Sequence, residues 1–198
     1  MNSAVTSGRI GPNAVIRLVE ALDAIESRTV TTKLFRSVDL ESYVVTPPDK
    51  MVAEDEVTVL HRKLRHDMGA ERAASVSWIA GLRTADYLLA NRIPKPVQRL
   101  LKILPRRIAG FILLKAIGSH AWTFAGTSRF TWRMGPPIEL AFEDCPLCRY
   151  DEAASPCCQY YAATFEHLFR ELIDADARVV ETCCIAAGAE ACRFEIRT

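Results

Sequence analysis

Chemically capable side chains concentrate near one end of this 198-residue sequence, where all seven cysteines fall between positions 145 and 192. Glu181 and Cys184 lie at the end of an expected strand, and Cys192 follows across a turn at Gly188. One ion could therefore bind both sides of this hairpin loop, and Cys158, at the start of the preceding helix, could complete the shell. Three thiolates and one carboxylate form a reasonable tetrahedral zinc site. Spacing alone leaves a second reading open, in which these cysteines are small buried apolar residues.

The remaining cysteines are Cys145, Cys148, Cys157 and Cys183. Cys145-Pro-Leu-Cys148 has the CxxC spacing of a structural-metal or redox pair, and Cys157 could add a third ligand. A second CxxC, which a zinc ribbon requires, does not occur in the sequence. We therefore expect these four to be buried or idle thiols.

The elements that position these residues follow from hydrophobic periodicity and from proline and glycine punctuation. Residues 40–50, with Pro47-Pro48, are expected to form a connection. Helices are predicted over residues 13–25 (capped by Asn13), 30–36, 53–68 (ended by Gly69), 70–91, 97–104, 106–120 (bent from the previous one at Pro105) and 157–173. Strands are predicted over residues 129–133, 138–142, 178–183 and 191–197.

A helical first half followed by strand, strand, helix, strand, strand predicts an α+β fold with the helices packed on an antiparallel sheet. Hydrophobic residues make up 49% of the chain, which is enough to fill one core. We expect a single domain over residues 1–198, with a helical part at 11–124 and a zinc-binding α/β part at 127–198.

Charge is distributed unevenly although the formal net charge is only +1. The segment between Tyr87 and Ile138 contains no Asp or Glu. Its nine cations are Arg92, Lys95, Arg99, Lys102, Arg106, Arg107, Lys115, Arg129 and Arg133. Such a basic run indicates an anionic ligand, an anionic membrane surface or an acidic partner, although a basic run is often only a solvated face.

The amino terminus lacks the apolar run and cleavage site of a signal peptide. The most hydrophobic stretch, Ile108 to Trp122, is interrupted by Lys115 and His120 and is short for a bilayer span. Seven cysteines without an export signal suit a reducing compartment. We therefore expect a cytoplasmic protein.

The stretch from Cys158 to Phe194, with Val-Val-Glu-Thr-Cys-Cys, Gly188 and Cys192-Arg-Phe, resembles the vinyl-4-reductase domain. That domain also occurs in phenol-responsive transcription activators, and its fold is similar to that of TRAPP vesicle-tethering subunits. The sensors bind zinc through a Cys, Glu, Cys, Cys set whose separations of 23, 3 and 8 recur here. The resemblance implies zinc at Cys158, Glu181, Cys184 and Cys192.

Two further segments, Ser7 to Ala14 and Tyr161 to Arg170, resemble the 4-vinyl reductase proteins of bacteriochlorophyll synthesis, and the likeness covers nearly the whole chain. No ATPase module or helix-turn-helix follows within the sequence, which disfavours the transcription-activator branch and a nucleic-acid partner. Domains of this type resemble proteins that pair through helical faces. A homodimer is therefore expected, with the apolar face of the first helix as the candidate surface.

The resemblance implies a divinyl (proto)chlorophyllide-type magnesium tetrapyrrole as ligand, and other enzymes of the pathway as partners. Hydride transfer needs a cofactor, yet no G-x-G-x-x-G follows an expected strand and a closed zinc site is redox-inert. We therefore expect a carrier or assembly factor, with a vinyl reductase using an external reductant and a small-ligand sensor as alternatives. Cations for the pigment carboxylate, an imidazole for magnesium and aromatic surface would come from Arg106, Arg107, Lys115, His120, Trp122 and Trp132.

Overall fold

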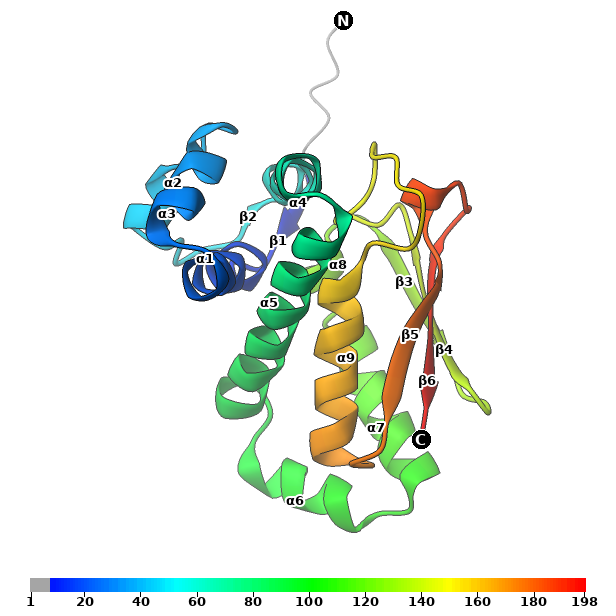
Figure 1. The fold of residues 1–198 in the computed structure, drawn as a ribbon. Helices are drawn as coiled ribbons and strands as arrows, with labels where there is room; N and C mark the ends of the chain where they lie inside the picture. Colours follow the sequence, from blue (N-terminus) through cyan, green and yellow to red (C-terminus); the bar gives the residue numbers. More distant parts are fainter. Residues whose placement is uncertain (1–7) are drawn as a thin grey trace, which may run out of the picture.

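A computed structural model describes residues 8–198 of the chain (Figure 1). Helices occupy the first half, and the second half contains four strands interrupted by one long helix. The α+β fold with its strand, strand, helix, strand, strand order is confirmed. Ser7, which opens the first quoted segment of resemblance, lies outside the described residues.

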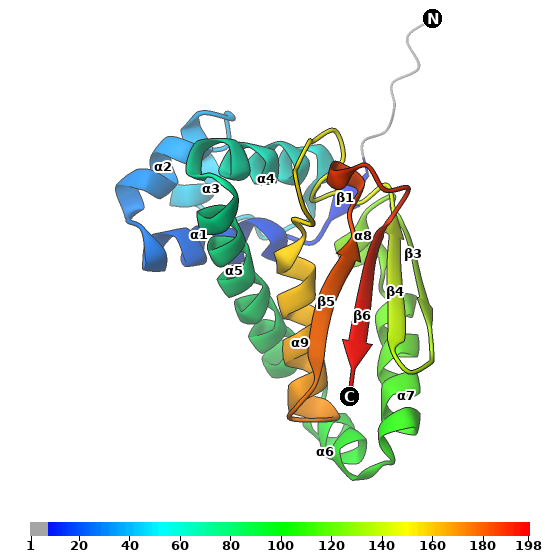
Figure 2. The same ribbon diagram turned by 45° about the vertical axis from the view of Figure 1, so that its right-hand side comes forward.

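The main sheet is antiparallel, with the strand order β3-β4-β6-β5. Side chains alternate between a buried and an exposed face along β4 and β6, as expected when one face of a sheet packs on a core. Helix α9 (Gln159–Leu172) packs against that face (Figure 2). The strands are β3 (Arg129–Arg133), β4 (Ile138–Glu143), β5 (Arg178–Cys183) and β6 (Cys192–Arg197).

The remaining helices begin and end close to the positions that periodicity predicts. They are α1 (Asn13–Ile25), α2 (Arg28–Arg36), α3 (Ser42–Val45), α4 (Glu54–Met68), α5 (Ala70–Asn91), α6 (Lys95–Ile103), α7 (Arg106–Ser119) and α8 (Trp122–Ala125). Gly69 ends α4 with a φ of 77°, as predicted. The expected role of Asn13 is wrong: Asn13 is the first helical residue, and Pro12, whose ring fixes φ near the helical value, precedes it as the cap.

Periodicity does not reveal α3, α8 or a pairing between two very short strands. Strand β1 (Arg9–Ile10) pairs with β2 (Val52–Ala53) and fastens the start of the described chain beside α4. A 3-10 turn at Ile185–Ala187 follows β5.

Helices α5 and α9 cross closely at Gly81. A Cβ at this position would lie 2.3 Å from the carbonyl oxygen of Tyr160, so only glycine fits the contact. The hydroxyl of Thr164 donates to the Gly81 carbonyl over 3.1 Å, and Thr84 and the Tyr160 hydroxyl are 2.7 Å apart. This seam joins the helical half to the sheet half.

Aromatic rings fill the space between α9 and the sheet. Phe142 stacks on Tyr161 with ring centroids 4.5 Å apart. The other members of this group are Phe124, Phe130, Phe165 and Phe194. Edge-to-face and stacked contacts of this kind add to burial, so Phe124 and Phe130 serve the core.

Helix α1 turns its apolar side toward the rest of the chain. Val15, Leu18 and Leu22 are fully buried, and the helix packs along α5. The expectation that this face forms a dimer surface is therefore wrong, because the chain itself covers the face. The homodimer stays a prediction.

No helix within residues 8–198 combines the length and the apolar character needed to cross a membrane.

Candidate metal centre

Six of the seven cysteines converge at one end of the sheet, where β4 and β5 finish and α9 and β6 begin. The segment after β4 carries Cys145, Cys148 and Cys157, and Cys158 caps the start of α9. Cys184 directly follows β5, and Cys192 is the first residue of β6. The antiparallel order places these ends together at the upper edge of the sheet in Figure 2.

The four predicted zinc ligands are brought together. The ligand atoms of Cys158, Glu181, Cys184 and Cys192 all lie within 4.8 Å of one another. The sulfur of Cys192 is 3.8 Å from that of Cys158 and 3.8 Å from that of Cys184. Zinc–sulfur bonds of about 2.3 Å in a tetrahedron place two sulfurs about 3.8 Å apart. The spacing therefore suits one tetrahedral ion.

A second group shares two of these residues. Cys145, Cys148, Cys158 and Cys192 are all buried, and their sulfurs also lie within 4.8 Å of one another. The sulfur of Cys145 is 3.7 Å from that of Cys158, and the sulfur of Cys148 is 3.3 Å from that of Cys192. Cys145 and Cys148 are buried as expected, but they belong to the cluster and do not stand apart from it.

The other two cysteines differ from each other. The sulfur of Cys157 lies 3.7 Å from that of Cys184, at the partly exposed margin of the cluster. Cys183 is half-buried and belongs to neither of the two groups.

The carboxyl group of Glu181 is incompletely paired. Its Oε2 accepts a hydrogen bond of 2.7 Å from the backbone N–H of Cys158, whereas the buried Oε1 has no partner among the described residues. Burial and then the nearby Cys184 sulfur raise the pKa of Glu181 to about 8. A buried acceptor without a partner is costly and rare in native proteins, and a cation would satisfy it. The residues present therefore fit a metal ion.

The thiols of the cluster compete for ionisation. Burial raises the pKa of the Cys145 thiol, and hydrogen bonding with Cys148 and its neighbours lowers the pKa of Cys184. Crowded thiols in a dry site cannot all carry charge by themselves, and a divalent cation removes that restriction.

Helix α4 fastens the Cys145–Cys148 segment from the far side. The hydroxyl of Thr58 donates to the Pro146 carbonyl over 2.6 Å, and Arg65 Nη2 donates to the Leu147 carbonyl over 2.7 Å. A third contact joins the buried side chains of Arg149 and Glu54 over 3.1 Å. These partners lie 82 to 95 positions apart, so spacing within the cysteine-rich region contains no signal for them.

The predicted pigment-binding residues are not gathered into one cavity. Arg106 forms an ion pair of 2.6 Å with Asp174, whose side chain is only 5% exposed. Arg107 and Lys115 are exposed on α7 and form no ion pair with the described residues. Arg106 and Arg107 border a recess of about 40 Å³, far smaller than a tetrapyrrole.

The remaining three predicted ligand residues lie at the other end of α7 and on β3. His120 is exposed, with Nδ1 2.9 Å from the Ala116 carbonyl oxygen, and Trp122 is 58% exposed. Trp132 is half-buried and meets the ring of Phe111 edge-on, with centroids 5.6 Å apart. These groups form an open aromatic and cationic face along α7.

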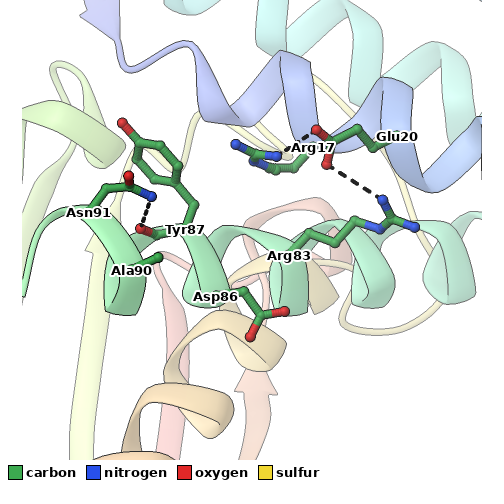
Figure 3. Close-up of a pocket in the computed structure, with 7 residues that line it drawn as sticks. All are labelled: Arg17, Glu20, Arg83, Asp86, Tyr87, Ala90 and Asn91. Carbon is green, nitrogen blue, oxygen red and sulfur yellow. Dashed lines mark hydrogen bonds and ion pairs between the residues drawn. The ribbon is translucent and has the colours of Figure 1, made fainter.

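A larger cleft of about 310 Å³ lies between α1 and α5 (Figure 3). Its charges are largely paired, since Glu20 contacts Arg17 at 2.5 Å and Arg83 at 3.5 Å. Arg17 also lies over the ring of Tyr87. This cleft therefore offers no excess of cations for an anionic pigment.

The histidines of α4 separate in an unexpected way. His66 is exposed, as expected for a charged helix, but His61 is fully buried, and neither ring nitrogen has a partner among the described residues. His167 pairs with Asp86 over 2.8 Å.

Comparisons with known proteins agree with the sequence resemblance. The vinyl-4-reductase domain family matches residues 138–198. The bacteriochlorophyll synthase 23 kDa chain of Cereibacter sphaeroides is 38% identical over 95% of this chain and 90% of its own length. The protein of the same name from Rhodobacter capsulatus is 37% identical over 94% of this chain and 85% of its own.

Among solved structures, an H-NOX protein from K. algicida superposes with a TM-score of 0.59 at 10% identity, covering 95% of this chain and 96% of that protein. A chain described for heme redox potential and porphyrin distortion has a TM-score of 0.53 at 12% identity, covering 96% of this chain and all of that one. These likenesses show that the fold is of the type shared by H-NOX proteins and vinyl-4-reductase domains. The phenol-responsive sensory domain of the activator PoxR superposes less closely, with a TM-score of 0.43 at 16% identity over 74% of this chain and 76% of that domain.

Proposed function

Because this chain belongs to the family of the bacteriochlorophyll synthase 23 kDa chains, we propose that it binds a divinyl (proto)chlorophyllide-type magnesium tetrapyrrole as a carrier or assembly factor. The observation that carries this proposal is the 38% identity along 95% of the chain. The name of these relatives also makes the synthase, or another pathway enzyme, the protein partner that receives the pigment.

The metal centre supports binding in preference to reduction. Zinc held by Cys158, Glu181, Cys184 and Cys192 would be a closed, redox-inert site that stabilises the β5–β6 hairpin. Vinyl reduction with an external reductant is the alternative reading of the same pathway assignment.

The pigment would lie on the open face formed by α7 and β3. Phe111 and Trp132 give apolar ring surface, and Arg107 and Lys115 are cations without an acidic partner in the described chain. His120 adds an exposed imidazole that could ligate magnesium. Arg106 is a weaker candidate than the sequence suggests, because Asp174 already neutralises it. The printed description of one protein of similar fold concerns a heme porphyrin, which is consistent with a fold that accommodates tetrapyrroles.

Mixing the purified protein with divinyl protochlorophyllide, with and without NADPH, tests the proposal. A bound, red-shifted and chemically unchanged pigment is the expected result. A blue shift to the monovinyl form on adding reductant would establish the reductase instead. No spectral change at any protein concentration would remove both readings.

Replacing Arg107 and Lys115 with Gln locates the pigment carboxylate. A charge-assisted carboxylate pair at a partly buried site is worth on the order of 2–3 kcal/mol, so affinity should fall roughly a hundredfold. Arg129→Gln is the matched control, since this exposed cation of the same run lies on β3 beside Glu143. A pigment esterified at the carboxylate should bind the wild type and the double variant alike. Equal affinities of the free acid for both proteins would remove this face from the proposal.

A second role, contact with an anionic membrane surface, is favoured by helix α6. Leu100 and Ile103 are 47% and 79% exposed, and they alternate with Arg99 and Lys102, which form no ion pair with the described residues. Exposed apolar side chains interleaved with cations are typical of helices that lie in a lipid interface. Such contact would bring the pigment to a membrane-bound receiving enzyme.

A further inference from the structure

We propose that the cysteine cluster holds two zinc-class divalent ions, with Cys158 and Cys192 shared between them. This inference rests on the zinc site of the proposed function and adds a second ion at Cys145 and Cys148. The first ion would take Cys158, Glu181, Cys184 and Cys192, and the second Cys145, Cys148, Cys158 and Cys192.

Ligand number supports sharing. Two four-coordinate ions need eight bonds, and the two groups together offer six side chains, of which two belong to both. Two shared thiolates therefore complete both shells. Six cysteines that hold two zinc ions occur as a known protein module, so the count is chemically reasonable.

Geometry supports the second ion separately from the first. The sulfur of Cys145 is 3.7 Å from that of Cys158, which in turn is 3.8 Å from that of Cys192. Both distances match the edge of a zinc–sulfur tetrahedron, about 3.8 Å. All four sulfurs of this group come from buried residues, whereas ordinary idle thiols have no reason to converge at ligand spacing.

Charge does not oppose the second ion. One divalent ion on three thiolates and one carboxylate leaves a net charge of −2. The thiolates of Cys145 and Cys148 add two negative charges and the second ion adds two positive ones, so the net charge of the centre is unchanged. Burying the larger centre therefore adds no uncompensated charge.

The second group is also held in place. Contacts from Thr58, Arg65 and the Glu54–Arg149 pair fix the Cys145–Cys148 segment to α4 at both backbone carbonyls between the two cysteines and at the residue that follows them. Fixed thiolates with supporting hydrogen bonds are what a closed structural metal site requires.

Metal counting tests the proposal on the full chain. The protein is produced with zinc supplied, and zinc, iron and protein are quantified together with the native mass. We expect two zinc ions per chain in the wild type and one in the Cys145→Ser, Cys148→Ser double variant. Cys183→Ser is the matched control and should keep both ions, because Cys183 lies outside both groups.

The zinc X-ray absorption spectrum of the wild type makes the test independent of how the variants fold. A shell dominated by sulfur with a metal–metal scattering component is expected from two ions that share thiolates. One zinc per chain, retained by the double variant, would overturn the second ion and keep the first. One zinc that the double variant loses and Glu181→Gln keeps would overturn both the shared pair and the predicted ligand set. No zinc, or iron in its place, would overturn the proposed zinc site together with this inference.

Discussion

The two ends of α9 lie in contrasting environments. At its first residue, buried sulfurs from four segments meet at ligand spacing, and α4 supports them with hydrogen bonds. Near its last turn, α6 and α7 expose apolar side chains and unpaired cations around a recess of only about 40 Å³ (Figures 1 and 2). We call these the cysteine end and the basic end.

The contrast separates the structural from the recognition chemistry of the molecule. The cysteine end is dry and over-determined, so a bound ion there would act through stability. The basic end has few internal contacts and many solvated charges, so its side chains are available to a pigment, a membrane or a partner. Substitutions at the two ends should therefore change different measurements.

The largest effect is expected at the cysteine end. Cys184→Ser and Cys192→Ser should each lose metal, and because metal-binding free energy is folding free energy, the free energy of unfolding should fall by more than about 3 kcal/mol. Metal content and denaturant unfolding check this, with Cys183→Ser as the control that changes neither. Full metal occupancy in either variant would contradict the ligand assignment.

The next effect concerns the seam that connects the two ends. Gly81→Ala places a Cβ against the Tyr160 carbonyl and should cost about 3 kcal/mol by overpacking. Gly110→Ala, at the basic end, meets its nearest atoms at 3.6 Å or more and should be neutral or gain up to about 1 kcal/mol from helix propensity. Thermal unfolding of both variants checks the pair, and equal losses would mean that the close approach of α5 and α9 has no special role.

A smaller effect depends on pH. Burial lowers the pKa of His61 to about 3, and it is about 6.5 in an unfolded chain. Between these values the unfolded state binds a proton that the folded state does not, so stability is complete above pH 6.5 and falls as pH decreases toward 3. At pH 5 the loss is about 2 kcal/mol.

His61→Leu should remove this part of the acid sensitivity, because neither imidazole nitrogen has a partner to lose among the described residues. Urea unfolding at pH 5 and pH 7.5 measures the difference, and the wild type controls for acid release of metal. The same pH dependence in both proteins would exclude His61 as the cause.

The smallest effect is expected on the surface of the basic end. Each cation near an anionic bilayer contributes about 1 kcal/mol, so Arg99→Gln and Lys102→Gln should each weaken binding to anionic vesicles roughly fivefold without changing stability. Sedimentation with vesicles at two salt concentrations checks this. Binding that neither substitution nor salt alters would leave α6 as ordinary solvated surface.

Much of the fold is predictable because it depends on local patterns. Helix α5 begins and ends where its apolar periodicity and the proline pair predict, and β3 and β4 flank the turn that Gly135-Pro136-Pro137 indicates. The four predicted zinc ligands flank one helix start and one hairpin, so spacing was sufficient to bring them together.

The rest depends on contacts between distant segments. The pairing of Arg9–Ile10 with Val52–Ala53 involves two residues on each side, too few for a pattern. The place of Cys145 and Cys148 in the cluster follows from the strand order and from α4, which a spacing argument does not contain. The burial of His61 is hidden because the helix around it is rich in charges that face solvent.

The order of the cluster residues along the chain has a consequence for biosynthesis. Chains fold as they are made, amino-terminal parts first, yet α4 and α5 find their partners in the segment after β4 and in α9, and the sulfur shell waits for β6, the last strand. The helical half must therefore emerge from the ribosome with its faces uncovered and stay competent until translation has passed Cys192. Metal capture is then a maturation step that only a fully translated β6 permits, and a chain stalled before it would expose both free thiols and apolar helices to proteolysis.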